Sequence, residues 1–320
     1  MKALVTGGTG FIGSHLVEEL MKEGFSTTCL VRKDSDLKWI ENYPMTYVVG
    51  DCVDNNTLKN IFSDFDYVFH VAGLTKAVKT EDFYCTNVTG TENLLHAIKK
   101  YNKKLKRFVH ISSIAVAGPS KEGMPLNASV MPEPVSEYGK SKLMAENFIQ
   151  AQKTELPVTI IRPPAVYGPR DKDFYLVFKM IQKGLFPYWG KAYYSLIYVE
   201  DLAKGIIKAI KTDKTIGNTY YLTDDNIYSN DELADTIAKQ LGCKYVKVKI
   251  PHNVIPMLAH ITEILKRKSI INSDKAKELK YSHWLCSCEE AKKDFGFQTQ
   301  VGLKEGIKWT ANWYKIHKWL

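Results

Sequence analysis

The chain has 320 residues, 45% of them hydrophobic, and its 44 basic and 35 acidic residues give a formal net charge of +9. A single core stops growing at roughly 250–300 residues, so this length predicts two domains, and the apolar content is ample for both. A membrane-spanning helix needs about 18 consecutive apolar residues, and no apolar run in the sequence is that long. The N-terminus is typical of a core strand rather than a signal peptide. These features argue against stable membrane insertion and favour a cytoplasmic protein.

The excess of positive charge raises the question of a nucleic-acid partner. Lysines such as Lys99, Lys100, Lys103, Lys104 and Lys106 lie at a predicted helix end and in the loop after it, where solvated basic residues are expected. No nucleic-acid partner is therefore predicted. The charge instead favours a general attraction for anionic small molecules, including the phosphates of a cofactor.

Six cysteines are scattered along the chain. Only Cys286 and Cys288 come close together, and their separation is too short for the spacing of a metal finger. Free thiols in a reducing compartment are predicted, and no metal site.

The N-terminal segment predicts a strand, a tight glycine turn and a helix. Ala3–Thr6 is a short apolar strand, and apolar residues at helical spacing follow from Ile12 onward. Glycine at Gly7, Gly10 and Gly13 permits the turn, leaves room for a pyrophosphate beside the backbone and lets the helix pack on the strand. The helix N-terminus adds unpaired N–H groups and a positive dipole end, so a dinucleotide site is predicted.

The second predicted strand, Thr27–Val31, ends where a dinucleotide fold distinguishes its two cofactors. An acidic residue there binds the ribose 2′-hydroxyl of NAD, whereas a basic residue accommodates the 2′-phosphate of NADP. Here Arg32 follows Val31, and its guanidinium can bind a phosphate bidentately. NADP is the predicted cofactor, with NAD as the alternative because a plain surface Arg-Lys pair next to Asp34 would give the same pattern.

Four more buried strands are predicted, at Thr46–Val49, Tyr67–Val71, Phe108–Ser112 and Val158–Arg162, with helices in the gaps between the strands. Alternating strands and helices predict an α/β fold, a Rossmann-type doubly wound parallel sheet covered on both faces.

A smaller C-terminal substrate domain is expected beside this sheet. The predicted division gives residues 1–165 to the nucleotide-binding domain, with 196–212 returning to it, and residues 166–195 and 213–320 to the substrate-binding domain. The terminal run with Trp309 and Trp313 predicts a helix that docks on this domain, with a membrane-surface helix as the alternative.

Tyr138 and Lys142 are four residues apart in a segment, Glu137–Ala151, whose apolar spacing predicts a helix. Both side chains would then lie on one face. An ammonium close to a phenol lowers the phenol pKa from about 10 toward the working range of a general acid/base. From the spacing alone, an ordinary surface helix is the better interpretation.

Motifs over most of the chain occur in the order of a known family. They are Val5–Gly13, Gly50-Asp51, Phe69–Gly73, Asn87–Thr91, His110–Ser113, Tyr138–Lys142, Arg162–Gly168 and Tyr198–Asp201. By these motifs the chain resembles the extended short-chain dehydrogenase/reductase family, the NAD-dependent epimerase/dehydratase superfamily, which includes sugar-nucleotide epimerases and dehydratases, dihydroflavonol reductases and hydroxysteroid dehydrogenases.

The resemblance implies three catalytic residues. Tyr138 would be the acid/base, Lys142 would hold the nicotinamide ribose and tune the tyrosine, and Ser113 would hydrogen-bond the substrate oxygen. Ser112 is the alternative for the last role. Ser113 is preferred because it ends the run before an Ala-Val-x-Gly turn.

The resemblance and the strand ends together also predict the cofactor contacts. They are Gly7, Gly10, Phe11, Ile12, Arg32, Asp51, Cys52, Val71, Ala72, Gly73, Asn87, Tyr138, Lys142 and Pro163. Asp51 is expected to cap the adenine ring.

The substrate class is less sharply marked. Relatives that bind nucleotide sugars usually carry Asn after the sixth strand and an Arg-Asp pair further on, whereas this chain has Ala165, and Tyr194 and Ser195. This chain thus lacks both anchors. In this respect, and in its Arg-Pro-Pro-Ala sequence, it resembles the dihydroflavonol reductase and hydroxysteroid dehydrogenase branch. Nearby aromatic residues indicate an apolar cavity.

Three functions therefore stay open from the sequence. The first is an NAD(P)-dependent oxidoreductase that reduces a ketone, aldehyde or β-keto compound with an apolar portion. A nucleotide-sugar epimerase or dehydratase is the alternative, and a catalytically silent dinucleotide-binding module is the second alternative. A homodimer is expected, formed by the helix after Asn87 and the helix that holds Tyr138.

Overall fold

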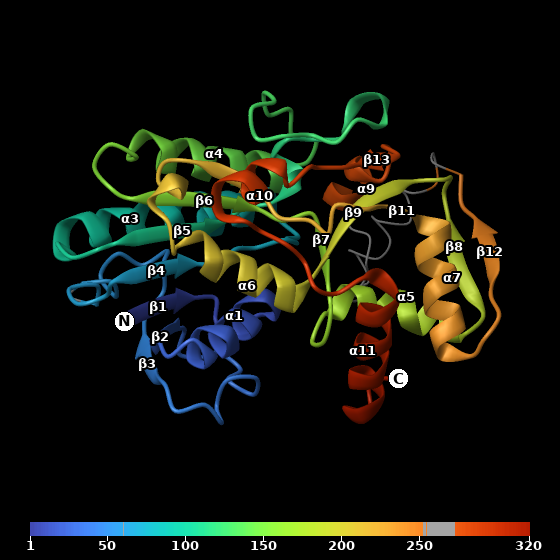
Figure 1. Ribbon diagram of the computed structural model, residues 1–320, viewed down its shortest axis with the longest axis horizontal. Helices are drawn as coiled ribbons and strands as arrows, with labels where there is room; N and C mark the ends of the chain where they lie inside the picture. Colours follow the sequence, from blue (N-terminus) through green and yellow to red (C-terminus); the bar gives the residue numbers. More distant parts are fainter. Residues whose placement is uncertain (60, 252–253, 255–272) are drawn as a thin grey trace.

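A seven-stranded parallel sheet forms the larger part of the computed structural model, which describes residues 1–59, 61–251, 254 and 273–320 (Figure 1). In order across the sheet, the strands are β10 (Thr219–Tyr221), β6 (Val158–Arg162), β5 (Arg107–Ile111), β4 (Tyr67–His70), β1 (Lys2–Thr6), β2 (Ser26–Val31) and β3 (Thr46–Val49). All neighbouring pairs are parallel. The predicted α/β class and Rossmann-type sheet are confirmed.

Helices cover both faces of this sheet. On one face α1 (Phe11–Lys22) and α6 (Val199–Ala209) pack in a core that includes Ala3 and Val5 of β1. On the other face α3 (Gly90–Tyr101) and α4 (Glu137–Ala151) pack around Leu4 of the same strand. Successive strand residues point to opposite faces, so three residues of β1 contribute to two cores.

The expectation of a helix in every gap between strands is wrong in two places. Residues 32–45 and the described residues of 50–66 form turns rather than regular helices. Asp34, Asp36 and Asp54 accept backbone or side-chain contacts from residues a few positions away, and Pro44 lacks an N–H donor. Such local contacts compete with helix formation.

The remaining elements build a second region at the carboxyl side of the chain (Figure 1). Its strands are β7 (Ala165–Tyr167), β8 (Leu185–Tyr188), β9 (Tyr193–Tyr198), β11 (Ile227–Ser229), β12 (Val246–Lys249) and β13 (His283–Trp284). Its helices are α5 (Lys172–Gln182), α7 (Asn230–Leu241), α9 (Ser273–Glu278) and α11 (Leu303–Ile316). Single-turn or short elements elsewhere are α2 (Thr80–Tyr84), η1 (Cys85–Thr89), η2 (Ile114–Val116), η3 (Lys121–Gly123), η4 (Asp213–Thr215) and α10 (Glu289–Phe295).

The chain returns to the sheet after α6, in a stretch that the sequence assigned to the substrate domain. β10 pairs with β6, and Phe295 of α10 joins the core beneath α1 and α6. The division of the chain into domains itself stays a prediction. A three-residue strand such as β10 is too short to leave a pattern in the sequence.

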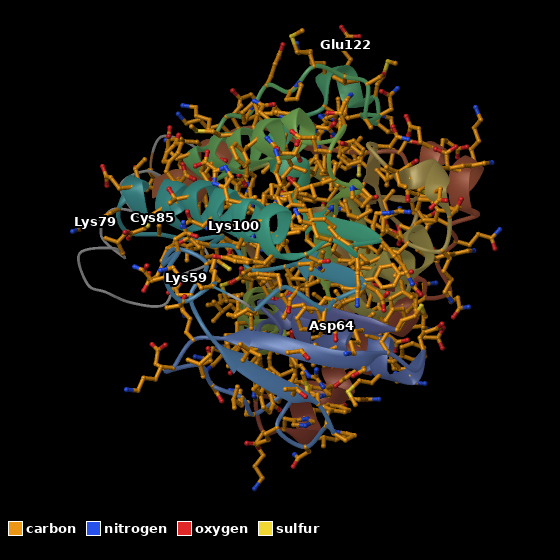
Figure 2. All side chains as sticks on the ribbon, turned by 90° about the vertical axis from the view of Figure 1, so that its left-hand side faces the viewer. Lys59, Asp64, Lys79, Cys85, Lys100 and Glu122 are labelled. Carbon is orange, nitrogen blue, oxygen red and sulfur yellow. The ribbon has the colours of Figure 1, made fainter. Side chains whose placement is uncertain are left out.

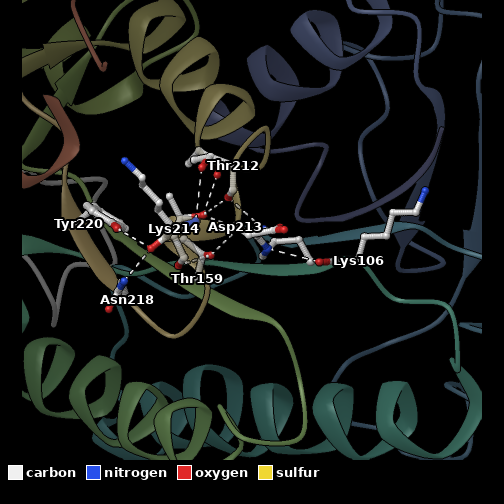
Figure 3. Close-up of polar contacts among 10 residues, drawn as sticks. Lys106, Thr159, Thr212, Asp213, Lys214, Asn218 and Tyr220 are labelled. Atoms are coloured by element: carbon white, nitrogen blue, oxygen red, sulfur yellow. Dashed lines mark hydrogen bonds and ion pairs between the residues drawn. The ribbon is translucent and has the colours of Figure 1, made fainter. Parts of the chain in front are cut away.

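Polar contacts around Thr159, Thr212 and Asp213 hold this return in place (Figure 3). Arg107, at the start of β5, is 2% exposed. Its guanidinium donates to the Thr212 carbonyl at 3.1 Å, the Thr159 hydroxyl at 3.3 Å and the Thr215 hydroxyl. Asp213 supplies the counter-charge at 3.2 Å. The network joins β5, β6 and the turn that leads to β10.

The C-terminal helix α11 docks on the second region. Ile307, Ala311 and Tyr314 are buried in its core, whereas Ile316 is 75% exposed. Across the described ranges, no helix has the length and apolar character needed to span a membrane.

Charges of both signs project from the face that carries α2 and α3 (Figure 2). Lys59, Lys79 and Lys100 lie on this face together with Asp64, and Glu122 lies on the loop above it. Asp64 pairs with Lys104 at 3.5 Å, so acidic side chains offset part of the basic charge.

Candidate active site

The glycine turn lies where the sheet reverses its strand order. β1 lies between β2 and β4, so the chain leaves the centre of the sheet in opposite directions on the two sides. In doubly wound folds, ligands bind in the crevice outside the carboxyl ends of the strands at this switch point. Two predicted segments, Gly7–Ile12 after β1 and Val71–Gly73 after β4, meet there.

The backbone of the turn explains its glycines. Gly7 has φ +70°, and a Cβ there would lie 2.6 Å from the Ala72 backbone nitrogen. A Cβ on Gly13 would lie 2.1 Å from the Gly7 carbonyl oxygen. Gly10 is the N-cap of α1, and Phe11 and Ile12 open its first turn, where helix geometry leaves N–H donors without partners in the helix. A dinucleotide pyrophosphate fits this cradle.

Arg32 and Asp51 follow β2 and β3 at the same edge of the sheet. The Arg32 side chain is 65% exposed, and its Nε lies 3.9 Å from Asp34 Oδ1, a weak contact that leaves the guanidinium accessible. Asp51 Oδ1 accepts the Val53 N–H at 3.0 Å, and burial raises the pKa of the neighbouring Cys52 thiol to about 12. Cys52 is therefore a neutral thiol at physiological pH.

Asn87 connects the loop after β4 to the helix that carries the predicted catalytic pair. Its Oδ1 accepts the Leu74 N–H at 2.7 Å, and its Nδ2 donates to the Leu74 carbonyl at 3.0 Å and the Ser141 hydroxyl at 2.9 Å. A Cβ on Gly73 would lie 3.7 Å from Lys142 Nζ, so this ammonium reaches the loop.

The predicted helix over Glu137–Ala151 is confirmed as α4. Ser136 caps it by accepting the Gly139 N–H at 3.0 Å. The Tyr138 ring lies 6.1 Å from the buried ring of Phe83, and the Ser113 side chain, just after β5, is close enough to lower the pKa of the Tyr138 phenol.

The two serines differ in their surroundings. Ser113 caps the short turn η2 by accepting the Ala115 N–H at 3.1 Å, and it contacts Tyr138. Ser112 is 4% exposed, and its hydroxyl has no partner within the described part of the chain. Pro163, after β6, supports the turn because its carbonyl accepts the Ile114 N–H at 3.0 Å.

Lys142, one turn further along α4 than Tyr138, is buried. Its ammonium donates to the Ile111 carbonyl at 2.7 Å and lies 3.1 Å from His110 Nε2. Burial lowers the pKa of Lys142 to about 8, opposed by the charge of Glu146, and burial also holds the pKa of His110 well below its usual range. A neutral His110 is therefore the acceptor for this ammonium.

One sequence-based expectation is wrong for the chain by itself. Burial raises the pKa of Tyr138 to about 12, against the expected lowering. The Lys142 ammonium is held by the Ile111 carbonyl and His110. Ser113 lowers the pKa of Tyr138, Glu278 raises it and Lys275 lowers it. The last two residues come from α9, which the sequence did not single out.

Most of the aromatic residues near the predicted cavity belong to the core of the second region instead. Tyr167, Phe178 and Phe186 are buried there. The Ser195 hydroxyl donates to the Cys286 carbonyl at 3.3 Å and accepts the Cys286 N–H at 3.1 Å. Its hydroxyl is therefore occupied within the fold.

Comparisons with known proteins agree with this geometry. Residues 3–222 match the model of the NAD dependent epimerase/dehydratase family. Ceramide reductase of Caulobacter vibrioides is 27% identical over 99% of this chain and 95% of its own. The 2-alkyl-3-oxoalkanoate reductase of Shewanella oneidensis is 26% identical over 96% of this chain and 84% of its own.

A solved structure of similar fold is UDP-glucuronic acid 4-epimerase from Bacillus cereus, in complex with UDP-glucuronic acid and NAD. It has a TM-score of 0.81 and 22% identity, and the match covers 99% of this chain and 100% of the other. The chain belongs to the NAD dependent epimerase/dehydratase family and is an NAD(P)-dependent enzyme of the extended short-chain dehydrogenase/reductase type.

Proposed function

We propose that the enzyme reduces a carbonyl compound with an apolar portion, using NADP in preference to NAD and the catalytic set Ser113, Tyr138 and Lys142. The observation that carries the proposal is the geometry of α4, which carries Tyr138 and the buried Lys142, with the Lys142 ammonium reaching the loop after β4 beside the glycine cradle. The names of the two reductase relatives, one for a ceramide and one for a β-keto acid with an alkyl substituent, support this substrate class.

The residues around the cradle would hold the cofactor in a definite order. Gly7–Ile12 would bind the pyrophosphate, Arg32 the 2′-phosphate and Asp51 the adenosine side. Lys142 would bind the nicotinamide ribose with the N–H donor that Ile111 and His110 leave. When bound, the nicotinamide supplies the hydride that a carbonyl carbon accepts.

The chain's own groups then manage the proton. With a pKa of about 12, Tyr138 holds its proton at neutral pH and can donate it to the substrate oxygen as that oxygen gains negative charge. Ser113 donates a second hydrogen bond to the same oxygen. Lys142 supplies a buried positive charge behind both groups.

A nucleotide-sugar reaction is less well supported. Ala165 offers no polar side chain, and the Ser195 hydroxyl is engaged by Cys286. Neither residue provides the charge-assisted contact that a sugar-nucleotide diphosphate or uridine needs.

A paired assay tests the reaction. Purified enzyme with NADPH is offered aromatic, steroid and β-keto carbonyls, and separately UDP- and GDP-sugars. We expect NADPH consumption with at least one carbonyl. Sugar conversion without net cofactor change, together with no reaction on any carbonyl, would favour the epimerase alternative.

The Tyr138→Phe variant tests the proton donor. We expect turnover to fall by a factor on the order of 10² or more with NADPH binding retained, because only proton transfer is removed. Tyr101→Phe is the matched control, since this tyrosine lies on α3 away from the site. Near-full activity of Tyr138→Phe would refute the assignment.

The cofactor preference is tested at Arg32. We expect Arg32→Asp to weaken NADPH binding and to leave or improve NADH binding, because a carboxylate repels the 2′-phosphate. Lys38→Asp is the control, since Lys38 lies in the same loop and pairs with Asp36 at 3.2 Å. Equal affinity of the unaltered enzyme for both cofactors would refute the preference.

A further inference from the structure

The short helix α9 contacts the start of the catalytic helix α4. Asp274 Oδ1 accepts the Glu137 N–H at 2.7 Å, and Oδ2 accepts the Tyr138 N–H at 2.9 Å. These are donors of the first helical turn, which have no partner inside the helix. A carboxylate at this end also interacts favourably with the helix dipole. Asp274 therefore holds the backbone of Tyr138 itself.

A second carboxylate of α9 supports the N-cap of the same helix. Glu278 is 5% exposed and accepts the Ser136 hydroxyl at 2.7 Å. Ser136 in turn accepts the Gly139 N–H. Glu278 also pairs with Lys275 at 2.5 Å, which balances the charge of this buried carboxylate. Three backbone N–H groups of α4 are thus fixed directly or indirectly by α9.

Lys275 completes this cluster through its pair with Glu278. The pair brings charges of both signs to the neighbourhood of Tyr138, where Glu278 raises the pKa of the phenol and Lys275 lowers it. Because these two effects oppose each other, the direct contact of α9 with the catalytic helix is the one that Asp274 makes to its backbone.

Building on the proposed function, we propose that α9 is a positioning element of the active site. Asp274 fixes the backbone that carries Tyr138, and Glu278, paired with Lys275, fixes the Ser136 hydroxyl that caps the same helix. The contact joins α9, in the second region, to α4, which covers the nucleotide-binding sheet. It therefore keeps the position of Tyr138 relative to the second region fixed during the reaction.

Hydrogen exchange tests the role of Asp274 without any substrate. A peptide that covers residues 134–142 reports the Glu137 and Tyr138 amides. We expect Asp274→Ala to speed their exchange by about tenfold or more and Asp274→Asn, which keeps one acceptor oxygen, to have a smaller effect. Lys280→Met, just beyond α9, is the control. Unchanged protection in Asp274→Ala, in a variant whose melting temperature shows it to be folded, would overturn the inference.

Steady-state kinetics test whether this contact matters to catalysis. Asp274→Ala should lower kcat for carbonyl reduction several-fold and leave the KM for NADPH unchanged, because it releases the backbone of the proton donor and not the glycine cradle. Asp274→Asn should recover part of kcat. A merely structural role would leave kcat unchanged or would change kcat and KM together, and either result would overturn the inference.

Two results separate this inference from the proposed function. Loss of amide protection in Asp274→Ala, in an enzyme that reduces no carbonyl, would support α9 positioning and reject the reductase. Normal carbonyl reduction with unchanged amide protection in Asp274→Ala would reject α9 positioning and leave the reductase in place.

Discussion

The ion pair between Arg162 and Glu146 provides a quantitative test of how the catalytic helix is anchored. The two side chains are 6% and 4% exposed. Arg162 donates from Nε at 2.9 Å and from Nη2 at 2.5 Å to the carboxylate, and from Nη1 at 3.2 Å to the Tyr221 hydroxyl. The pair therefore joins β6, α4 and β10, one turn beyond Lys142.

Glu146→Gln removes the charge with almost no change in volume. It leaves a buried guanidinium without its counter-ion and sets an amide NH₂ against N–H donors. Loss of one partner of a buried pair costs about 3–5 kcal/mol, and we expect a value in this range because neither group can reach solvent in the fold. Replacement of both groups in Glu146→Met with Arg162→Met removes the unpaired charge and should recover most of the loss.

The assay is urea unfolding at neutral pH of Glu146→Gln and of a double-mutant cycle made of Glu146→Met, Arg162→Met and the two combined. The two single losses should exceed the loss of the double variant by about 2 kcal/mol or more. Glu155→Gln is the matched control, because its pair with Lys99 is 2.6 Å long but about half exposed, and such pairs contribute about 0–1 kcal/mol. Additive losses in the cycle, or a Glu146→Gln loss no larger than that of the control, would refute the reasoning.

Two further predictions concern pH and assembly. Burial raises the pKa of Asp171 to about 7, so the folded chain keeps a proton that the unfolded chain releases near pH 4. The free energy of unfolding should therefore be highest below pH 4 and fall by on the order of a few kcal/mol as the pH rises to 7. Above pH 7 it should stay level. Asp171→Asn should abolish this fall in urea unfolding from pH 4 to 8, and a fall of equal size in the variant would contradict the assignment. The chain should form a homodimer through α3 and α4, whose Met144 is 51% exposed, so light scattering should give the mass of two chains and Met144→Glu that of one. A monomer mass for the unaltered chain at micromolar concentration would rule the dimer out.

The sequence predicted the sheet well because most of its strands are buried on both faces; the edge strand β3, predicted as buried, is partly exposed, with Val49 at 64%. Six runs of apolar residues gave six strands of the sheet to within a residue or two at each end, and α4 was predicted at its observed bounds. The failures have physical causes. Residues 32–45 form local turns, and no helical spacing of apolar residues in this stretch favours a helix over them. Strand β10 is only three residues long.

The cofactor side of the site was also within reach of sequence reasoning. Gly7, Arg32, Asp51 and Gly73 each follow a strand, and the carboxyl ends of parallel strands meet at one edge of the sheet. The contribution of α9 was not within reach. Its contact to Tyr138 spans 136 residues, and a lone Asp carries no periodic signal.

For Tyr138 and Lys142, the sequence pattern predicted the helix that carries them but not their contacts. Helical spacing correctly placed both residues on one helix, α4, but it could not tell what each charge faces. The ammonium needs hydrogen-bond acceptors once buried, and the Ile111 carbonyl and His110 provide them at the end of β5. The phenol keeps its proton at neutral pH, and this is the state that a proton donor for carbonyl reduction requires.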